Sequence, residues 1–406
     1  YTGQEPFVEY SNYFNAYAVF TNSAQAGSDH PQYSLVRTTA FSSTFDATLD
    51  YIITIPSGAT GQELVDGFMT NSSAPWASGR HKLPVMIVND NAGTTEAGGS
   101  GGETAIVGKS AGFNFQGILV HEAFHTIAGL GDEYESDPGG FDFTGLPAEP
   151  NTTTNTVFAG IPWNAWIDTN ATPIPTPNNL SGNPYENNVG LFEGAHYNVT
   201  GWYRPKLNCR MRSVTTGVPL CEVCREALVK NFYSKIRGID QSTPLSTAIS
   251  ITSNAPVTFN VVKLQPSSHA LAIQWQLNGT NVSGATNDSY NLDPSTLTNG
   301  LYSLRAIVHD DTDWVRTDPS ATLFCTNTWG VTIAIPRLWI ESPMATGGQF
   351  RFTVRGSGVT NFTIRAATNL ASWASISTNA LVGGQFNYTN TSGLPLRFYR
   401  VVAPPQ

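Results

Sequence analysis

The pattern of apolar residues changes near residue 240, and this change limits the possible folds more than any other feature of the chain. Before it, strand-like runs mix with runs of helical period, the strands at 51–55 and 83–88 and the helices at 115–128 and 222–236. From residue 241 onward the apolar runs are short and alternating, and Asn-Gly, Gly-Gly and Ser-Gly turns separate them. The sequence therefore predicts a multi-domain protein, with an α/β (α+β) domain over residues 1–238 followed by all-β domains.

The all-β part divides once more, because Pro336 marks a linker between two groups of strands. Over residues 239–335, a strand around Trp275, a turn and a later apolar strand resemble an immunoglobulin-like β-sandwich. Residues 336–406 predict a small C-terminal β-sandwich module, similar to those on many secreted bacterial proteins. The Asn, Thr and aromatic residues of both domains favour binding to glycans, proteins or other surfaces.

Charge and composition exclude two classes of partner. The chain has 21 Lys and Arg against 30 Asp and Glu, a net charge of −9, so nucleic acid is not an expected partner. No apolar run reaches the roughly 18 residues that a membrane-spanning helix needs, so membrane insertion is not expected. The chain opens on Tyr1-Thr-Gly-Gln4, which predicts a secreted protein whose leader peptide has been removed. The resemblance of the C-terminal module to those of secreted bacterial proteins predicts a bacterial source.

The segment His121-Glu-Ala-Phe-His125 carries the strongest chemical signal in the chain. Two histidines four residues apart lie on one face of a helix and bind one zinc ion together. Glu122 is then placed to act as general base toward the water that zinc activates. Gly129 allows a sharp turn after the helix, so that Asp132 returns as the third ligand, with Glu133 as the alternative. The fourth position stays open for water.

Two other interpretations of this segment fit less well. An ordinary surface helix with two histidines does not explain the apolar run Ile118–Val120 before the motif. The acidic cluster that continues with Glu135 and Asp137 is also typical of a solvated loop or a Ca²⁺ site, but no calcium motif supports that ion. The predicted cofactor is therefore one catalytic Zn²⁺.

The cysteines are unevenly spaced. Cys209, Cys221 and Cys224 lie close together, and Cys325 is far away. A Cys-x-x-Cys zinc site needs a second pair of ligands, which the neighbouring sequence does not supply. The spacing therefore favours a disulfide from Cys209 to either Cys221 or Cys224.

Several motifs in sequence order resemble the IgA-peptidase-like family of metzincin zinc metallopeptidases, over about residues 7–235. The histidine motif is followed by Gly-Leu-Gly-Asp-Glu-Tyr, as in that family. Phe14–Val19 is similar to the family's first strand and Gly98–Gly102 to its glycine-rich edge region. Three segments are similar to the part of that family that returns to the active site: Phe192–Ala195, Gly201–Pro205 and Cys209–Arg212. Cys221–Cys224 closes the match.

The resemblance implies a metzincin-like zincin catalytic domain and roles for further residues. Met211 would lie in the Met-turn, an apolar floor below the three metal ligands, or be an ordinary core methionine. Tyr203 would donate a hydrogen bond to the oxyanion, with a plain core tyrosine as the alternative. Gly98 and Gly99 would line the substrate cleft. His196 would face the substrate or add a ligand, unless it is a satisfied surface histidine.

These observations predict a secreted zinc endopeptidase that hydrolyses the peptide bonds of a protein or peptide substrate, with Glu122 as general base. The main alternative is an adhesion protein whose β domains bind glycans or proteins and whose zincin-like domain is not proteolytic. A second alternative is metal-dependent deacylation of a non-peptide amide. An intact Glu122 favours the peptidase, because a purely structural metal site does not need it.

Overall fold

The computed structural model of the chain describes residues 3–48, 52–56, 66–67, 69–70, 83–90, 99–102, 104–109, 115–135, 148–215, 217–390 and 397–403. The chain forms two compact units. Unit 1 contains Tyr1–Gly238 and two later segments, Leu264–Leu271 and Asp310–Leu323. Unit 2 contains Ile239–Lys263, Ala272–His309 and Phe324–Gln406. The division into three domains stays a prediction.

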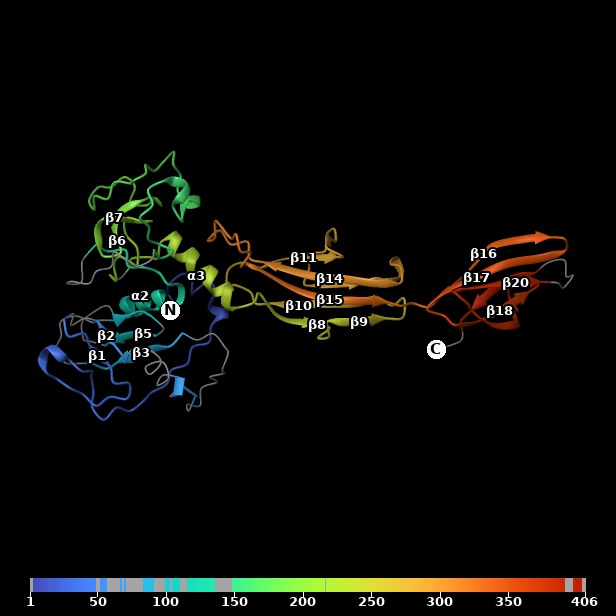
Figure 1. Cartoon of the computed structure of the whole chain (residues 1–406), viewed down its shortest axis with the longest axis horizontal. Coiled ribbons are helices and arrows are strands. Elements are labelled where there is room, and N and C mark those ends of the chain that lie inside the picture. The colour runs from blue at the N-terminus through green and yellow to red at the C-terminus, as the bar shows by residue number, and fades with distance from the viewer. Residues whose placement is uncertain are drawn as a thin grey trace. The chain divides into compact units, whose positions relative to one another are not determined.

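The sheet of unit 1 that lies next to the predicted metal motif has the order β3–β5–β4. Figure 1 labels its strands β3 and β5. Strands β3 (Val85–Val88) and β5 (Ala105–Gly108) pair in parallel, and the short edge strand β4 (Gly99–Ser100) pairs with β5 in the antiparallel direction. β5 is buried along its whole length, which its run of small and branched apolar residues explains. A second pair, β1 (Thr44–Phe45) with β2 (Ile53–Thr54), shares an apolar core with this sheet.

Two long helices complete the core of unit 1, and they confirm the helices that the sequence period predicted. α2 (Phe115–Ala128) packs against β5 and β4, and α3 (Glu222–Lys235) packs against α2. Phe7, near the N-terminus, stacks on Phe124 of α2 at 5.9 Å and also contacts Phe232 of α3. The predicted strand at Phe14–Val19 is wrong, because this segment has no strand pairing.

The remaining elements of unit 1 include a hairpin of β6 (Phe192–Ala195) and β7 (Asn198–Arg204). Its turn residues, His196 and Tyr197, have positive φ angles of 52° and 63°. Short 3-10 helices in unit 1 are η1 (Ser11–Tyr13), η2 (Pro31–Tyr33), η3 (Phe158–Gly160) and η4 (Asn164–Trp166). No helix in the described part of the chain is both long and apolar enough to cross a membrane.

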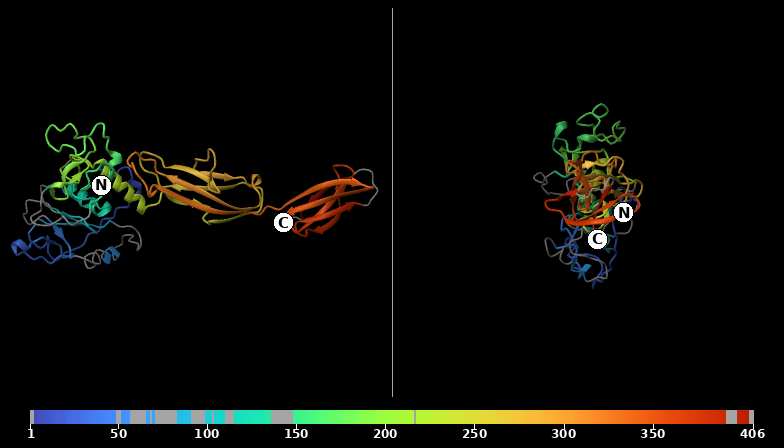
Figure 2. Two further views of the ribbon diagram at one scale, coloured as in Figure 1. Left: turned by 45° about the horizontal axis from the view of Figure 1, so that its top comes forward. Right: turned by 90° about the vertical axis from the view of Figure 1, so that its right-hand side faces the viewer.

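The strands of unit 2 form four sheets, drawn in yellow to red in Figure 2. The first is β13 (Ser289–Leu292), β10 (Val257–Lys263) and β8 (Ile239–Thr243). The second is β12 (Thr280–Asn281), β11 (Ala272–Leu277), β14 (Gly300–His309), β15 (Phe324–Ile333) and β9 (Ala248–Ile251), and η5 (Pro294–Thr296) precedes β14. Phe259 and Trp275 both pack on Trp329, so these two sheets share one core.

The last two sheets of unit 2 also share a core. One is β16 (Arg337–Thr346), β17 (Gln349–Ser357) and β20 (Gln385–Asn390), and the other is β19 (Ala374–Ala380), β18 (Asn361–Ala367) and β21 (Phe398–Val402). Alternate residues of β17 and β18 are buried against each other, namely Phe352, Val354, Phe362 and Ile364. The prediction of a mixed N-terminal part followed by all-β structure is confirmed.

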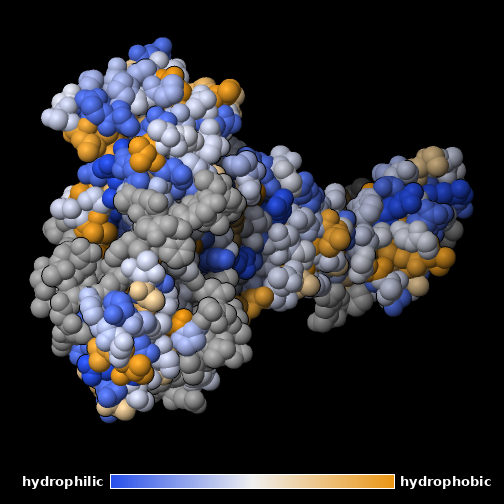
Figure 3. Space-filling view, turned by 60° about the vertical axis from the view of Figure 1, so that its left-hand side comes forward, coloured by the Kyte–Doolittle hydropathy of each residue, from blue (hydrophilic) through white to orange (hydrophobic). Residues whose placement is uncertain are grey.

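The surface carries hydrophobic residues in small groups. On the face that Figure 3 shows, these groups are separated by hydrophilic residues. Scattered exposed apolar residues of this kind are normal for folded proteins.

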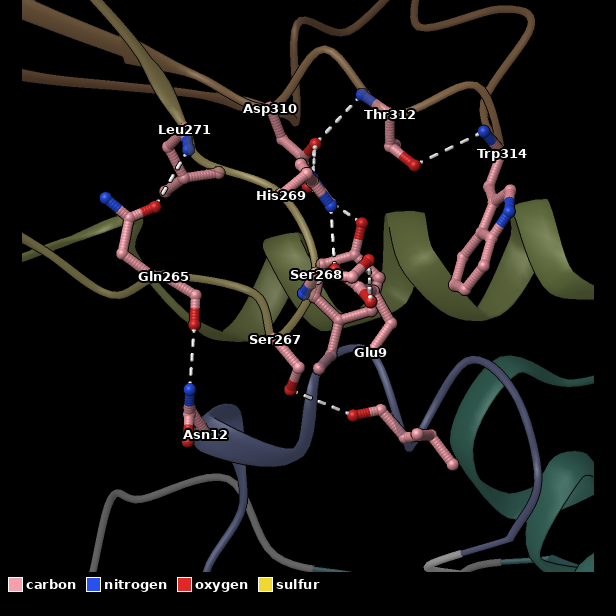
Figure 4. Close-up of polar contacts among 12 residues, drawn as sticks. Glu9, Asn12, Gln265, Ser267, Ser268, His269, Leu271, Asp310, Thr312 and Trp314 are labelled. Atoms are coloured by element: carbon pink, nitrogen blue, oxygen red, sulfur yellow. Dashed lines mark hydrogen bonds and ion pairs between the residues drawn. The ribbon is translucent and has the colours of Figure 1, made fainter.

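A buried polar cluster ties the two later segments of unit 1 to its N-terminus (Figure 4). His269 bridges two carboxylates: its Nδ1 lies 2.7 Å from Glu9 Oε1 and its Nε2 lies 2.7 Å from Asp310 Oδ1. The hydroxyls of Tyr10 and Tyr233 donate to the other oxygen of Asp310. Because both carboxylates are buried, a protonated His269 is the charge that compensates them.

We expect this bridge to make the stability of unit 1 depend on pH. Burial alone lowers the pKa of His269, but the hydrogen bonds and charges of Asp310 and Glu9 outweigh it and raise the pKa above 6.5. The stabilisation is therefore complete below pH 6.5 and is lost as the pH rises through the raised pKa. Burial alone raises the pKa of Glu9, but hydrogen bonds from Ser268 and His269 lower it below 4.5, so its contribution is lost only as the pH falls through that lowered pKa.

Thermal unfolding of the wild-type chain and H269Q at about pH 6 and about pH 9 tests this expectation. Between these two pH values, unit 1 of the wild type should lose about 1.5–3 kcal/mol of stability, the range for hydrogen bonds to charged groups. H269Q should lose much less, whereas H309Q, which changes a histidine of unit 2, should behave like the wild type. Equal pH dependence in H269Q and wild type would contradict the assigned role of His269.

Candidate metal centre

The chain reverses after α2 through two glycines, and this reversal brings Asp132 back to the histidines. Gly129 has a φ of +59° and its N–H donates to the carbonyl of His125 at 2.9 Å, as at the C-terminal end of many helices. A side chain at Gly131 would place its Cβ 2.5 Å from a carboxylate atom of Glu149, so that position also has no room for one. The predicted turn at Gly129 is confirmed.

Three donor atoms converge at the end of this reversal. His121 Nε2 lies 2.9 Å from Asp132 Oδ1, His125 Nε2 lies 3.3 Å from the same oxygen, and the two Nε2 atoms lie 3.1 Å apart. In a tetrahedral site with bonds of about 2.0–2.1 Å, neighbouring ligand atoms lie about 3.3 Å apart. The spacing of the three donors therefore fits a metal ion of this kind.

Hydrogen bonds on the far side of each ring fix the orientation of the histidines. His121 Nδ1 lies 3.1 Å from the carbonyl oxygen of Arg210, and His125 Nδ1 lies 2.5 Å from that of Leu130. A carbonyl only accepts, so each Nδ1 carries a proton and each Nε2 is left as the nitrogen that can bind a metal. This is the tautomer that a metal-binding histidine needs.

The charges at the site also favour a cation. Burial alone raises the pKa of Asp132, but the charges and hydrogen bonds of His125 and His121 outweigh it and hold the pKa well below its usual range. Burial alone lowers the pKa of His125, yet the charge of Asp132 raises it to about 9. The buried carboxylate thus draws a positive charge into the pocket, which a bound metal supplies in place of the proton.

Tyr197 is the residue at this site that sequence reasoning missed. Its hydroxyl donates to Asp132 Oδ2, the carboxylate oxygen that does not face the histidines. Its ring packs edge-on against Tyr134, which in turn stacks on His121. The position of Tyr197 depends on its positive φ in the β6–β7 turn, and no motif in the sequence predicts that conformation.

Glu122 lies on α2 between the two histidines in sequence and is half-buried. Burial raises its pKa, the charges of His121 and His125 lower it, and the net effect is an increase. A carboxylate with a raised pKa beside a metal site is suited to accept and return a proton.

Comparison with known proteins identifies the family. The sequence profile described as IgA Peptidase M64 matches residues 1–182 and 178–232, more than half of the chain. The chain belongs to the IgA peptidase M64 family. This family membership makes it a metallopeptidase, a hydrolase, and it confirms the resemblance found in the sequence. No curated protein matches the chain.

Three solved structures that are similar to parts of this M64 peptidase are distant from it. The fibronectin(III)-like modules of Clostridium thermocellum CbhA have 10% identity and a TM-score of 0.17, covering 36% of this chain and 77% of that one. Three N-terminal domains of the bacteriophage RB49 outer capsid protein Hoc have 13% identity and a TM-score of 0.18, covering 37% and 57%. A β-glucuronidase of Bacteroides uniformis has 9% identity and a TM-score of 0.17, covering 51% and 28%. Similarities this low support no conclusion about the peptidase.

The two candidate third ligands of the M64 peptidase point to different places. Asp132 lies with the histidines, whereas Glu133 lies against Cys224, with its Oε1 3.1 Å from the sulfur. Met211 is fully buried, and its carbonyl accepts a hydrogen bond from the Glu133 N–H at 2.9 Å. The backbone at Met211 therefore supports the segment that carries Asp132.

Three other predicted site residues lie in or next to strands: Tyr203 in β7, His196 in the β6–β7 turn and Gly99 in β4. Tyr203 lies in β7, where its backbone pairs with Thr153 and Glu193, and its predicted oxyanion role stays a prediction. His196 is 1% exposed and stacks on Trp202, with Nδ1 2.9 Å from Glu149, so it is not a surface histidine and does not face solvent. Gly99 lies in edge strand β4, and Gly98 lies outside the described residues.

The predicted disulfide is wrong, because all four cysteines are free thiols. The sulfurs of Cys209 and Cys224 lie 3.9 Å apart, which is about twice a disulfide bond length of roughly 2.05 Å. The spacing argument failed because it considered only cysteines as partners, and Glu133 lies among them in the fold.

We expect Y197F to weaken metal binding at the histidine site. Without the hydroxyl, Asp132 loses the hydrogen bond that orients it, and such outer contacts are typically worth about 10–100-fold in metal affinity. Competition against a chelating dye measures the effect, with Y203F as the matched control because that hydroxyl has no contact with Asp132 among the described residues. Equal affinities in Y197F and Y203F would show that Tyr197 does not hold the ligand.

Proposed function

We propose that this metallopeptidase is a secreted zinc endopeptidase with a metzincin-like catalytic domain and with Glu122 as its general base. The observation that carries the proposal is the convergence of His121 Nε2, His125 Nε2 and Asp132 Oδ1 within 3.3 Å of one another. Two imidazoles and one carboxylate, with no fourth side chain of the described residues in the group, match the ligand sets of catalytic zinc sites. The abundance of Asn and Thr and the β domains support an extracellular location.

His121, His125 and Asp132 would hold the ion, and the remaining residues act on protons and orientation. When bound, zinc lowers the pKa of a coordinated water toward neutrality and polarises a carbonyl oxygen. Glu122 accepts the proton of the attacking water and returns it to the leaving amine of the peptide. Tyr197 keeps Asp132 in place through its hydroxyl, and the buried Met211 would form the apolar floor beneath the ligands.

The substrate chain would lie along β4, the edge strand of the β3–β5–β4 sheet. The glycine-rich segment beside it approaches the metal site closely, because a Cβ at Gly101 would lie 2.3 Å from the Cβ of His125. An extended peptide can pair with an exposed strand edge through its backbone, which suits an enzyme that cuts peptide bonds. Binding of glycans, proteins or surfaces by the β domains of unit 2 stays a prediction.

The adhesion protein remains the alternative from another functional class. A domain that only supports adhesion has no use for a half-buried carboxylate whose raised pKa suits proton transfer. A deacylase would use the same groups, and the edge strand β4 beside the site favours a peptide over a small amide.

We expect E122Q to lose proteolysis while it keeps its metal. Removing the group that carries the proton should lower kcat/KM on an unfolded protein such as casein by about 10²–10⁴-fold. Metal analysis should show unchanged zinc at the histidine site, because the substitution leaves the three ligands in place. Removal of zinc with a chelator should abolish the wild-type activity, and added zinc should restore it.

The matched control is E186Q, the same chemical change at an exposed position of unit 1. It should retain wild-type activity and zinc content. Casein cleavage by E122Q within about threefold of wild type would rule out Glu122 as the general base, and cleavage that survives chelation would rule out the metal mechanism.

A further inference from the structure

A second cluster of metal-binding side chains lies in unit 1, separate from the histidine site. It consists of Glu133, Cys209, Cys221 and Cys224, here called the cysteine cluster. Glu133, Cys209 and Cys224 are fully buried and Cys221 is 5% exposed. The histidine site uses none of these side chains, so the proposed peptidase mechanism leaves them without a role.

The geometry of the cluster fits one tetrahedral ion. All four ligand atoms lie within 4.8 Å of one another. Cys209 Sγ and Cys224 Sγ are 3.9 Å apart, and Cys224 Sγ is 3.1 Å from Glu133 Oε1. In a tetrahedral zinc site with bonds of about 2.3 Å to sulfur, neighbouring sulfurs lie about 3.8 Å apart. The sulfur spacing is therefore that of two ligands of one ion.

The carboxylate of Glu133 supplies an independent observation. Its Oε1 accepts a hydrogen bond from Asn151 Nδ2 at 2.9 Å. Among the described residues, its Oε2 has no hydrogen-bond partner, although the side chain is fully buried. A buried carboxylate oxygen without a partner costs about 1–3 kcal/mol or more, so its retention calls for a ligand that the protein chain itself does not supply.

The local backbone favours thiolates at this position. Cys221 is the N-cap of α3 and Cys224 lies in its first turn, where the helix dipole stabilises negative charge. The N–H of Cys221 donates to Cys209 Sγ at 3.2 Å, a contact that supports a sulfur with anionic character. Three thiols also cannot all pair with one another as disulfides, whereas one ion can bind all three.

We propose that the cysteine cluster is a second metal site that holds one structural Zn²⁺ through three thiolates and one carboxylate. Thiolates select zinc over the harder divalent cations, and a site with four protein ligands leaves no position open for water. The ion would join the segment that follows α2, the loop at Met211 and the start of α3. Since Glu133 is adjacent to Asp132, it would also hold the third ligand of the histidine site in place.

The test is the metal content of the full-length H121Q/H125Q variant, in which the histidine site is disabled. We expect two zinc ions per chain in the wild type and one in the variant, by mass spectrometry of the metal. X-ray absorption on the variant should show mainly sulfur ligands at about 2.3 Å, with a minor oxygen contribution at about 2.0–2.2 Å. The single zinc and the sulfur ligands expected in H121Q/H125Q do not depend on the histidine site or on peptidase activity. Failure of the proposed function would lower only the wild-type count, from two ions to one.

Cysteine variants complete the design. C221S/C224S should lose the sulfur-bound zinc, whereas C325S, the matched control outside the cluster, should keep both ions. Alkylation of the denatured, metal-free wild type should find four free thiols. If C221S/C224S fails to fold, the H121Q/H125Q result still decides the question. A metal-free H121Q/H125Q protein that is folded, or a disulfide within the cluster, would overturn the proposal.

Discussion

Three backbone hydrogen bonds to the segment Asp132–Tyr134 hold the functional part of this molecule together. The N–H of Glu133 donates to the carbonyl of Met211 at 2.9 Å, and the carbonyls of Asp132 and Tyr134 accept from the β6–β7 turn. With its backbone held from both sides, the segment sends successive side chains to different places. Asp132 meets the histidines of α2, and Glu133 meets the cysteines of the neighbouring loop and helix.

The local energetics of unit 1 follow from this arrangement. Each cluster gathers buried acidic or metal-binding groups, which an apolar core of the same volume would replace without loss of stability. Burying these polar and charged groups costs free energy. The hydrophobic packing of α2, α3 and β5 has to offset that cost until bound cations compensate the charges. Departures from the usual rule of an apolar interior are expected at functional sites, and here they coincide with the histidine motif and the segment that follows it.

The parts of the site that sequence reasoning found are local, and those it missed are not. α2 and its two histidines follow from helical period and a spacing of four residues. The contact of Tyr197 with Asp132 spans 65 residues and relies on a left-handed turn that sequence pattern does not reveal. Glu133 and Cys224 are 91 residues apart, so a rule based on cysteine spacing led to a disulfide instead.

Asn151 connects the segment of the histidine site to the cysteine cluster through hydrogen bonds. Its amide oxygen accepts from the N–H of Gly131, and its amide nitrogen donates both to the carbonyl of Gly131 and to Glu133. One buried side chain therefore fixes the glycine that leads into Asp132 and the acid that follows it. Because Asp132 lies between these two anchored positions, its carboxylate has little freedom to turn away from the histidines. In the proposed zinc site, the third ligand would be positioned by residues that do not themselves bind the metal, and this explains how a short, irregular loop could supply a ligand as well fixed as those on a helix.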